Sequence, residues 1–160
     1  MRDTKNTLKA ATRGKSIVLS GGVLVNILDL ERQAKQAHWN LRGANFIALH
    51  ELFDKLADGA RALADEVAER MAALGGEVDG TSSSIASRST LEPYPSGANS
   101  EEAHVAHVAK VVADCSALAR AAVEDADKWG DPATADVMTE VTRELDKLGW
   151  MVEAHLPAAE

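Results

Sequence analysis

Apolar and polar residues recur with a helical period along four long segments of the chain. The first runs from about Gly22 to Arg42, with Gly43 placed to end a helix. Its apolar stripe consists of Ile27, Leu30, Ala34, Ala37 and Leu41. The second keeps the same rhythm from Phe46 to Leu74, until two glycines follow. The pattern therefore predicts two successive amphipathic helices, the second of about thirty residues.

The second half of the chain repeats this arrangement after a long interruption. Residues 79–99 are rich in Ser, Thr, Pro and Gly, which predicts a crossover with one short helix around Ser84 to Ser87. Ser100 is placed as the N-cap of a third helix that runs to about Lys128. A fourth helix is expected from Asp131, with Pro132 in its first turn.

Two helical hairpins joined by one long link indicate an all-α protein with the connectivity of a ferritin-like four-helix bundle. The crossover lies between helices two and three and contains the short helix. Composition agrees, because 46% of the residues are hydrophobic but only 4% are aromatic. We expect three parts: a basic N-terminal tail (1–19), the bundle (20–156) and a short C-terminal tail (157–160).

Charge is unevenly distributed. The net charge of the chain is −8, yet residues 1–15 hold five basic side chains against one acidic side chain. A basic tail on an acidic body is typical of a nucleic-acid arm, and the alternative is a disordered, solvated terminus. The candidate DNA-binding residues are Lys5, Lys9, Arg13 and Lys15.

Cysteine content and hydropathy bear on where the protein works. The lone Cys115 lies in an apolar stretch and cannot form an internal disulfide, which fits a reducing cytoplasm. No apolar run approaches the roughly 20 residues that span a bilayer. We expect a cytoplasmic protein without membrane association, and a nucleoid-associated one if the tail binds DNA.

Helix two carries ligand-type side chains on one face. With His50 at zero and 100° per residue, Asp54 falls at about 40°, Asp65 at about 60° and Glu69 at about 100°. The apolar stripe centres about 145° away, so these groups point out of the chain's own core. An ordinary ferritin centre needs inward Glu-x-x-His pairs from two helices, whereas the chain has one such pair, Glu101 with His104.

One chain cannot close a metal site on this face. Asp54 and Asp65 are eleven residues apart, about 16 Å along the axis, far beyond metal–ligand distances near 2 Å. Two copies of helix two packed antiparallel across a two-fold axis would bring the His50 end of one to the Glu69 end of the other. His38, at the end of helix one, can complete the set.

Imidazole with carboxylates suits Fe(II), and zinc or manganese stay open on ligand type alone. Each residue also has a simpler explanation. A histidine on a helix flank often packs by hydrogen bonding, and carboxylates on a helix face are usually solvated. In that case helix two forms only a charged dimer interface with no redox role.

Three segments carry a resemblance to a known family. They are KQAHWNLRGANFIALHELF from Lys35 to Phe53, DEVAERMAALGG from Asp65 to Gly76, and TADVMTEVTRELDKLGWMVEAH from Thr134 to His155. They resemble the Dps family (DNA-binding protein from starved cells), which are miniferritins. The resemblance covers nearly everything from about residue 25 to residue 155.

The resemblance implies a ferroxidase that stores iron and protects against oxidative stress. Two ferrous ions would be oxidised at a di-iron site on the two-fold subunit interface, with hydrogen peroxide preferred over oxygen, and the ferric product kept in a hollow dodecamer. Carried over, the ligands are His38 and His50 of one subunit and Asp65 and Glu69 of its partner, with Asp54 as an additional carboxylate. Trp39 resembles the tryptophan beside the iron centre, and an interface anchor is the alternative.

The resemblance also implies acidic pores near the start of the last helix, which would place Asp131 and Asp136 there. For Asp131 the alternative is a helix N-cap. His104 and His107 are one turn apart and could hold a metal, although two surface histidines on an exposed flank are the simpler expectation. Trp129 and Trp150 are expected in packing or interfaces, and His155 at a helix end.

Overall fold

The computed structural model describes residues 1–98 and 100–157, and this part of the chain forms five helices. Asn99, the predicted end of the crossover, and residues 158–160 of the predicted C-terminal tail lie outside the described residues. The helices are α1 (Ala10–Asn40), α2 (Phe46–Ala73), α3 (Ser82–Arg88), α4 (Glu101–Lys128) and α5 (Pro132–Glu153).

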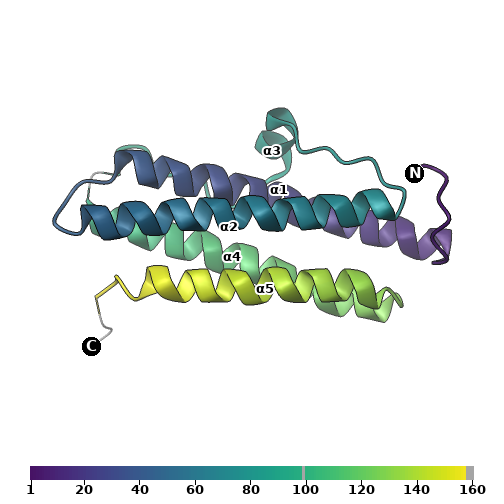
Figure 1. The fold of residues 1–160 in the computed structure, drawn as a ribbon. Helices are drawn as coiled ribbons and strands as arrows, with labels where there is room; N and C mark the ends of the chain where they lie inside the picture. The colour runs from purple at the N-terminus through teal and green to yellow at the C-terminus, as the bar shows by residue number, and fades with distance from the viewer. Residues whose placement is uncertain (99, 158–160) are drawn as a thin grey trace.

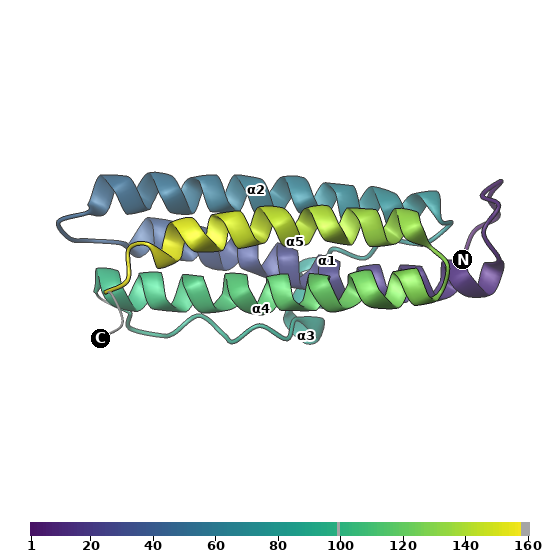
Figure 2. The same cartoon turned by 90° about the horizontal axis from the view of Figure 1, so that it is seen from below.

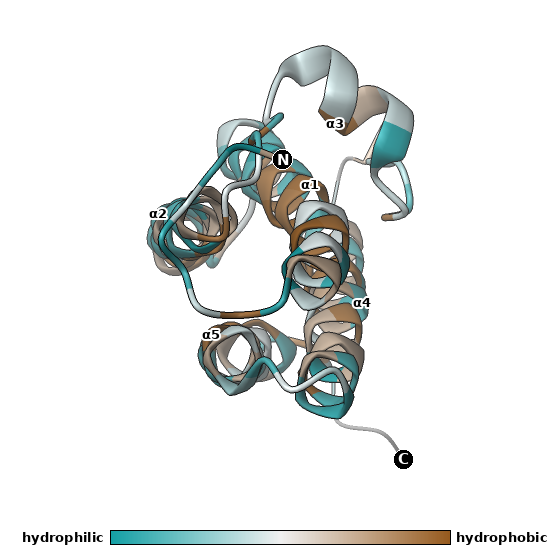
Figure 3. Cartoon of the chain, turned by 90° about the vertical axis from the view of Figure 1, so that its right-hand side faces the viewer, coloured by the Kyte–Doolittle hydropathy of each residue, from teal (hydrophilic) through white to brown (hydrophobic). Residues whose placement is uncertain are grey.

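The four long helices form a bundle in which α1 pairs with α2 and α4 pairs with α5 (Figures 1 and 2). Contacts of α1 with α4 and of α2 with α5 close the ring. Viewed along the bundle axis, α3 lies outside the ring, next to α1 (Figure 3). This confirms the predicted all-α, ferritin-like fold and the short helix within the crossover.

The core consists of the apolar stripes of all four long helices. Ile27, Phe53, Leu56, Val108 and Leu145 are fully buried. Because each large buried side chain contributes about 1.5–3 kcal/mol relative to exposure, these stripes supply most of the driving force for the bundle. Cys115 lies among them, and burial raises the pKa of its thiol to about 12.

The predicted start of helix one at Gly22 is wrong, since α1 begins twelve residues earlier, at Ala10. The buried residues in and next to this additional part of the helix are small: Ser16, Ser20 and Gly21. A search for large apolar residues at helical spacing misses such a face, although it packs closely. Half of the predicted tail is therefore helical.

The ends of the other helices follow their local signals. Gly75 has a φ of +84°, and the N–H groups of Gly75 and Gly76 donate to Ala72 O and Met71 O at the end of α2. Ser100 caps α4, since its side chain accepts from Ala103 N. Pro132 occupies the first turn of α5. Within residues 1–98 and 100–157, none of the helices combines the length and apolar character that crossing a membrane requires.

Candidate metal centre

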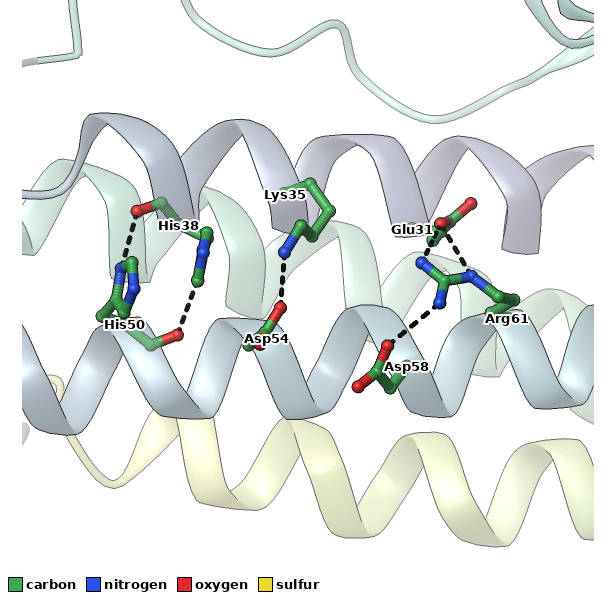
Figure 4. Close-up of polar contacts among 7 residues, drawn as sticks. All are labelled: Glu31, Lys35, His38, His50, Asp54, Asp58 and Arg61. Atoms are coloured by element: carbon green, nitrogen blue, oxygen red, sulfur yellow. Dashed lines mark hydrogen bonds and ion pairs between the residues drawn. The ribbon is translucent and has the colours of Figure 1, made fainter.

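His38 and His50 face each other where α1 and α2 come together at one end of the bundle (Figure 4). Their rings are stacked, with centroids 3.6 Å apart and planes inclined by 18°. Each Nδ1 lies within hydrogen-bond distance of the other residue's backbone oxygen, His38 Nδ1 at 2.8 Å from His50 O and His50 Nδ1 at 3.1 Å from His38 O. Two residues that are twelve positions apart thus hold each other in a reciprocal pair.

This reciprocal bonding determines which ring nitrogens can bind a metal. A carbonyl oxygen only accepts, so both Nδ1 atoms carry the proton and donate. In its neutral form, each ring keeps a lone pair on Nε2, the atom that coordinates metals when Nδ1 is bonded to a carbonyl. His38 is buried and His50 is partly buried, which leaves the pair accessible from one side.

Asp54 lies one turn beyond His50 and is engaged by a lysine from α1. Lys35 Nζ is 2.5 Å from Asp54 Oδ1 (Figure 4). The hydrogen bond from Lys35 holds the pKa of Asp54 below its ordinary value, and the charges of Lys35, His38 and His50 act in the same direction. The carboxylate is therefore ionised and close to the histidine pair, although an ammonium group competes with any metal for it.

A second set of charged residues lies farther along the contact between α1 and α2. Arg61 of α2 donates to Glu31 Oε1 of α1 through Nε at 3.3 Å and Nη2 at 2.9 Å, and to Asp58 Oδ1 at 3.2 Å (Figure 4). Glu31 is 5% exposed, so its carboxylate needs this guanidinium. Arg61 therefore forms ion pairs with both carboxylates, so Glu31 and Asp58 are not free to bind a metal.

Asp65 and Glu69 are exposed near the other end of α2. Asp65 also lines a hollow of about 660 Å³ between α1 and α2, whose walls include Leu24, Leu28 and Ala68. The orientation predicted from helical angles is thus observed, since neither carboxylate points into the bundle core. Within residues 1–98 and 100–157, no three side chains among His, Cys, Asp and Glu come together in one subunit as a metal-binding group.

Large apolar side chains surround the histidine pair on the outside. Trp39 is 68% exposed, Ile47 is 63% exposed and Phe46 is 37% exposed, with the Phe46 ring 4.9 Å from that of His50. Lys35 Nζ lies 5.8 Å from the Trp39 ring centroid. Exposed apolar groups gathered beside polar ligands are typical of a surface that another protein covers.

Comparisons with known proteins agree with this geometry. The family model described as a ferritin-like domain matches residues 23–160. The chain is 36% identical over 153 residues to the DNA protection during starvation protein of Agrobacterium fabrum, covering 96% of this chain and 94% of that protein. The chain belongs to the Dps family.

Solved structures of Dps proteins resemble the chain over nearly its whole length. DpsA14 from Streptomyces coelicolor has a TM-score of 0.91 and 36% identity, covering 98% of this chain and 92% of that one. Mycobacterium smegmatis Dps has a TM-score of 0.91 and 31% identity, with 98% and 95% covered. Dps from Microbacterium arborescens, in a structure described as the high iron form, has a TM-score of 0.84 and 32% identity, with 95% and 97% covered.

The two predicted pore residues of this Dps chain, Asp131 and Asp136, differ in their exposure to solvent. Asp131 is fully buried; it accepts from Arg70 Nη2 at 2.6 Å and from Thr134 N at 3.1 Å and Thr134 Oγ1 at 2.7 Å. Burial raises the pKa of Asp131, but the Thr134 hydrogen bonds and the Arg70 charge outweigh it, and the net pKa is lowered. A carboxylate enclosed in this way cannot line an aqueous pore, so the pore assignment of Asp131 is wrong and its role is that of an N-cap. Asp136 is exposed.

The predicted DNA-binding residues also separate into two groups. Lys5 and Lys9 are exposed. Arg13 donates to Leu8 O at 3.3 Å and to Leu74 O at 3.0 Å, and Lys15 lies over the Trp129 ring at 5.4 Å. The last two side chains therefore help to pack the start of α1 onto the bundle.

The expectation of surface histidines on α4 is wrong, because His104 is 1% exposed and His107 is 8% exposed. Tyr94 of the crossover bonds to His104 Nδ1, and His107 Nε2 lies 2.6 Å from Gln33 Oε1 of α1. The polar spacing suggested a solvated flank, while the crossover, whose path no helical pattern predicts, covers it. Glu101 is also occupied, accepting from Asn45 N at 2.7 Å at the start of α2.

The remaining predicted residues lie as follows. Trp150 of α5 is 65% exposed, and its place in a subunit interface stays a prediction. Trp129 is partly buried beneath Lys15, and His155 is exposed just beyond α5.

Proposed function

We propose that this Dps chain is a ferroxidase and an iron-storage protein. It oxidises Fe(II), with hydrogen peroxide as the preferred oxidant, at sites shared between two subunits, and it keeps the ferric product in a hollow dodecamer. The observation that carries the proposal is the His38–His50 pair, whose Nδ1 atoms are held by backbone carbonyls while both Nε2 lone pairs stay free for a metal. The high iron form of the Microbacterium arborescens relative supports iron as the metal.

The missing hard ligands come from the partner subunit in this proposal. An antiparallel two-fold pairing of α2 places Asp65 and Glu69 of one subunit opposite the histidine pair of the other. The exposed Trp39 and Ile47 and the apolar hollow beside Asp65 then cover each other. Each pair of subunits forms two equivalent sites, each with imidazole nitrogens from one chain and carboxylates from the other.

The reaction needs two electrons for each peroxide. Two ferrous ions give up one electron each, and hydrogen peroxide takes both electrons and two protons to form two water molecules. Delivery of both electrons at one site avoids release of hydroxyl radical. Carboxylates stabilise the ferric product, since oxygen ligands suit the harder ion, and the acidic body of the chain favours its mineral. Asp136, exposed near the start of α5, is proposed to line the entry pore.

The test is replacement of His38, His50, Asp65 and Glu69 by Ala, each alone, with Fe(II) oxidation followed by absorbance after peroxide is added. A large loss of rate with particle mass unchanged is expected for each of the four. Lys147→Ala is the matched control, because Lys147 lies on α5 and, among the described residues, forms an ion pair only with Glu144 one turn earlier on the same exposed helix face. If the histidine variants oxidise iron as fast as the original chain, the proposal fails.

DNA binding through the N-terminal segment is the alternative function. It is favoured by the exposure of Lys5 and Lys9 and by the name of the Agrobacterium fabrum relative. Multiple segments on one particle would add avidity to weak phosphate contacts. The test is DNA retardation at increasing salt for the full chain and for a chain lacking residues 2–9. Equal mobility shifts for the two proteins would exclude this segment from DNA binding.

A further inference from the structure

A second group of redox and proton-bearing side chains lies beneath the crossover, outside the candidate metal centre. Tyr94 bonds through its hydroxyl to His104 Nδ1, and its ring meets the His107 ring edge-on at 4.9 Å. His107 in turn is bonded to Gln33, whose Nε2 donates to Glu92 O at 3.1 Å. Tyr94 also lines an open hollow of about 430 Å³ between α1, α3 and the crossover.

His104, the imidazole bonded to Tyr94, is in a state to accept a proton. Burial lowers the pKa of His104, so the ring is neutral at pH 7, and the backbone of Asn40 acts on the ring in the opposite direction. His104 Nε2 is buried and makes no hydrogen bond among the described residues. A neutral ring carries one proton, and in the tautomer that places this proton on Nε2, Nδ1 accepts the hydrogen bond from the Tyr94 phenol.

The Tyr94–His104 pair is connected to the candidate metal centre through the end of α1. Asn40 ends α1, two residues after His38 and directly after Trp39. His104 therefore packs against the same last turn of α1 that carries one of the two imidazoles of the site. Among the described residues no charged side chain bonds to the Tyr94 hydroxyl, and burial raises the pKa of Tyr94 to about 12.

A phenol hydrogen-bonded to a neutral imidazole is a one-electron donor. Loss of an electron makes the phenol strongly acidic, and its proton moves along the existing hydrogen bond to the imidazole. The buried pair thus loses an electron without creating an unpaired charge on the tyrosine. We propose that Tyr94 and His104 supply the second electron for peroxide reduction when the His38–His50 site holds only one ferrous ion. This rests on the ferroxidase function proposed above.

The step balances with hydrogen peroxide as the oxidant. One ferrous ion gives one electron and becomes ferric. Tyr94 gives the second electron and becomes a neutral phenoxyl radical, while its proton passes to His104. Peroxide takes both electrons and two protons from solvent, and its O–O bond breaks to give two waters, while the tyrosine proton stays on His104. A later ferrous ion returns an electron, and the proton comes back with it to restore the phenol.

The need for such a donor follows from the Lys35–Asp54 pair. While Lys35 occupies Asp54, one carboxylate is withheld from the site, which favours binding of a single ferrous ion over two. One ferrous ion alone reduces peroxide by one electron and leaves hydroxyl radical. A second electron from Tyr94 prevents this release of hydroxyl radical.

The experiment uses the assembled protein, loaded anaerobically with one Fe(II) per subunit, mixed with peroxide and frozen within milliseconds for electron paramagnetic resonance. Tyr94 is the only tyrosine in the chain, so ring-deuterated tyrosine labels one site and identifies its radical by a narrowed signal. The variants are Tyr94→Phe, which removes only the hydroxyl, and His104→Gln, which keeps an acceptor but cannot take the proton. His107→Gln is the matched control, since His107 touches the same ring without bonding to the hydroxyl.

The expected result is a tyrosyl signal in the original chain and in His107→Gln, lost in Tyr94→Phe and several-fold weaker in His104→Gln. Spin-trapped hydroxyl radical should rise several-fold in Tyr94→Phe, with particle mass and oxidation at two Fe(II) per subunit unchanged. A protein that oxidises iron normally but shows no deuterium-sensitive signal overturns the electron-donor role and leaves the ferroxidase function standing. A protein that oxidises iron no faster than His38→Ala overturns both.

Discussion

Lys35 of α1 and Asp54 of α2 form an ion pair of 2.5 Å one turn from the histidine pair, so a lysine holds the carboxylate that the family resemblance assigns to iron. The ammonium therefore competes with any metal for this carboxylate. The pair is partly exposed, with side-chain exposures of 22% and 48%, so its own contribution to stability is small. We expect its effect to fall mainly on the affinity of the proposed site for Fe(II).

Lys35→Met should therefore raise the number or affinity of Fe(II) ions bound per subunit. The substitution keeps most of the apolar stem against Trp39 and removes only the charge. Anaerobic titration calorimetry with Fe(II) measures the change, and Lys147→Met on α5 serves as the control. Unchanged stoichiometry and affinity in Lys35→Met would mean that the ammonium does not compete with the metal.

Sharing of the site between subunits can be tested by complementation. A chain with His38→Ala and His50→Ala, and a second chain with Asp65→Ala and Glu69→Ala, should each be inactive alone. In a mixed pair, one of the two sites combines intact histidines with intact carboxylates. Random assembly makes half of the pairs mixed, so co-expression should restore roughly a quarter of the original rate. No recovery in co-assembled particles, verified by mass, would contradict sharing.

Asp131 and Asp136 should respond in opposite ways to replacement by Ala. Asp131→Ala leaves the guanidinium of Arg70, 15% exposed, without its partner and removes the cap of α5, which should cost about 3 kcal/mol or more. Asp136→Ala should change stability by less than about 0.5 kcal/mol while slowing iron entry. Urea unfolding and initial rates of iron uptake separate the two, and the pore proposal for Asp136 is lost if uptake is unaffected.

The buried histidines predict a loss of stability in mild acid. Burial lowers the pKa of His104 and of His107 below the ordinary 6.5. As the pH falls through 6.5 the unfolded chain binds protons that the folded chain refuses, so unfolding becomes easier. Above that pH both states are neutral and the histidines contribute no pH dependence.

Urea unfolding at pH 7.5, 6.5 and 5.5 measures this effect. The double replacement His104→Gln and His107→Gln should flatten the dependence over this range, although it lowers stability at every pH. His155→Gln, at an exposed residue beyond α5, is the control and should leave the slope unchanged. An equal slope in the double variant and the original chain would assign the dependence to other groups.

The sequence by itself determined the four long helices, because each carries enough large apolar residues at helical spacing to define a buried face. Capping signals are equally local, since Ser100 and Pro132 act within one turn of their own position. The outward direction of Asp65 and Glu69 also follows from helical angles alone. These are local properties, fixed by residues close together in the chain.

Only the tertiary structure decided the contacts between distant segments. The residues buried most deeply at the start of α1 are Ser16, Ser20 and Gly21, whose pattern carries no apolar signal, so helical periodicity does not predict this part of the helix. The burial of His104 depends on where a loop of irregular backbone runs, and the engagement of Asp54 depends on a lysine nineteen residues earlier. Helical periodicity determines which way a side chain points, but which partner it finds there depends on how the helices pack.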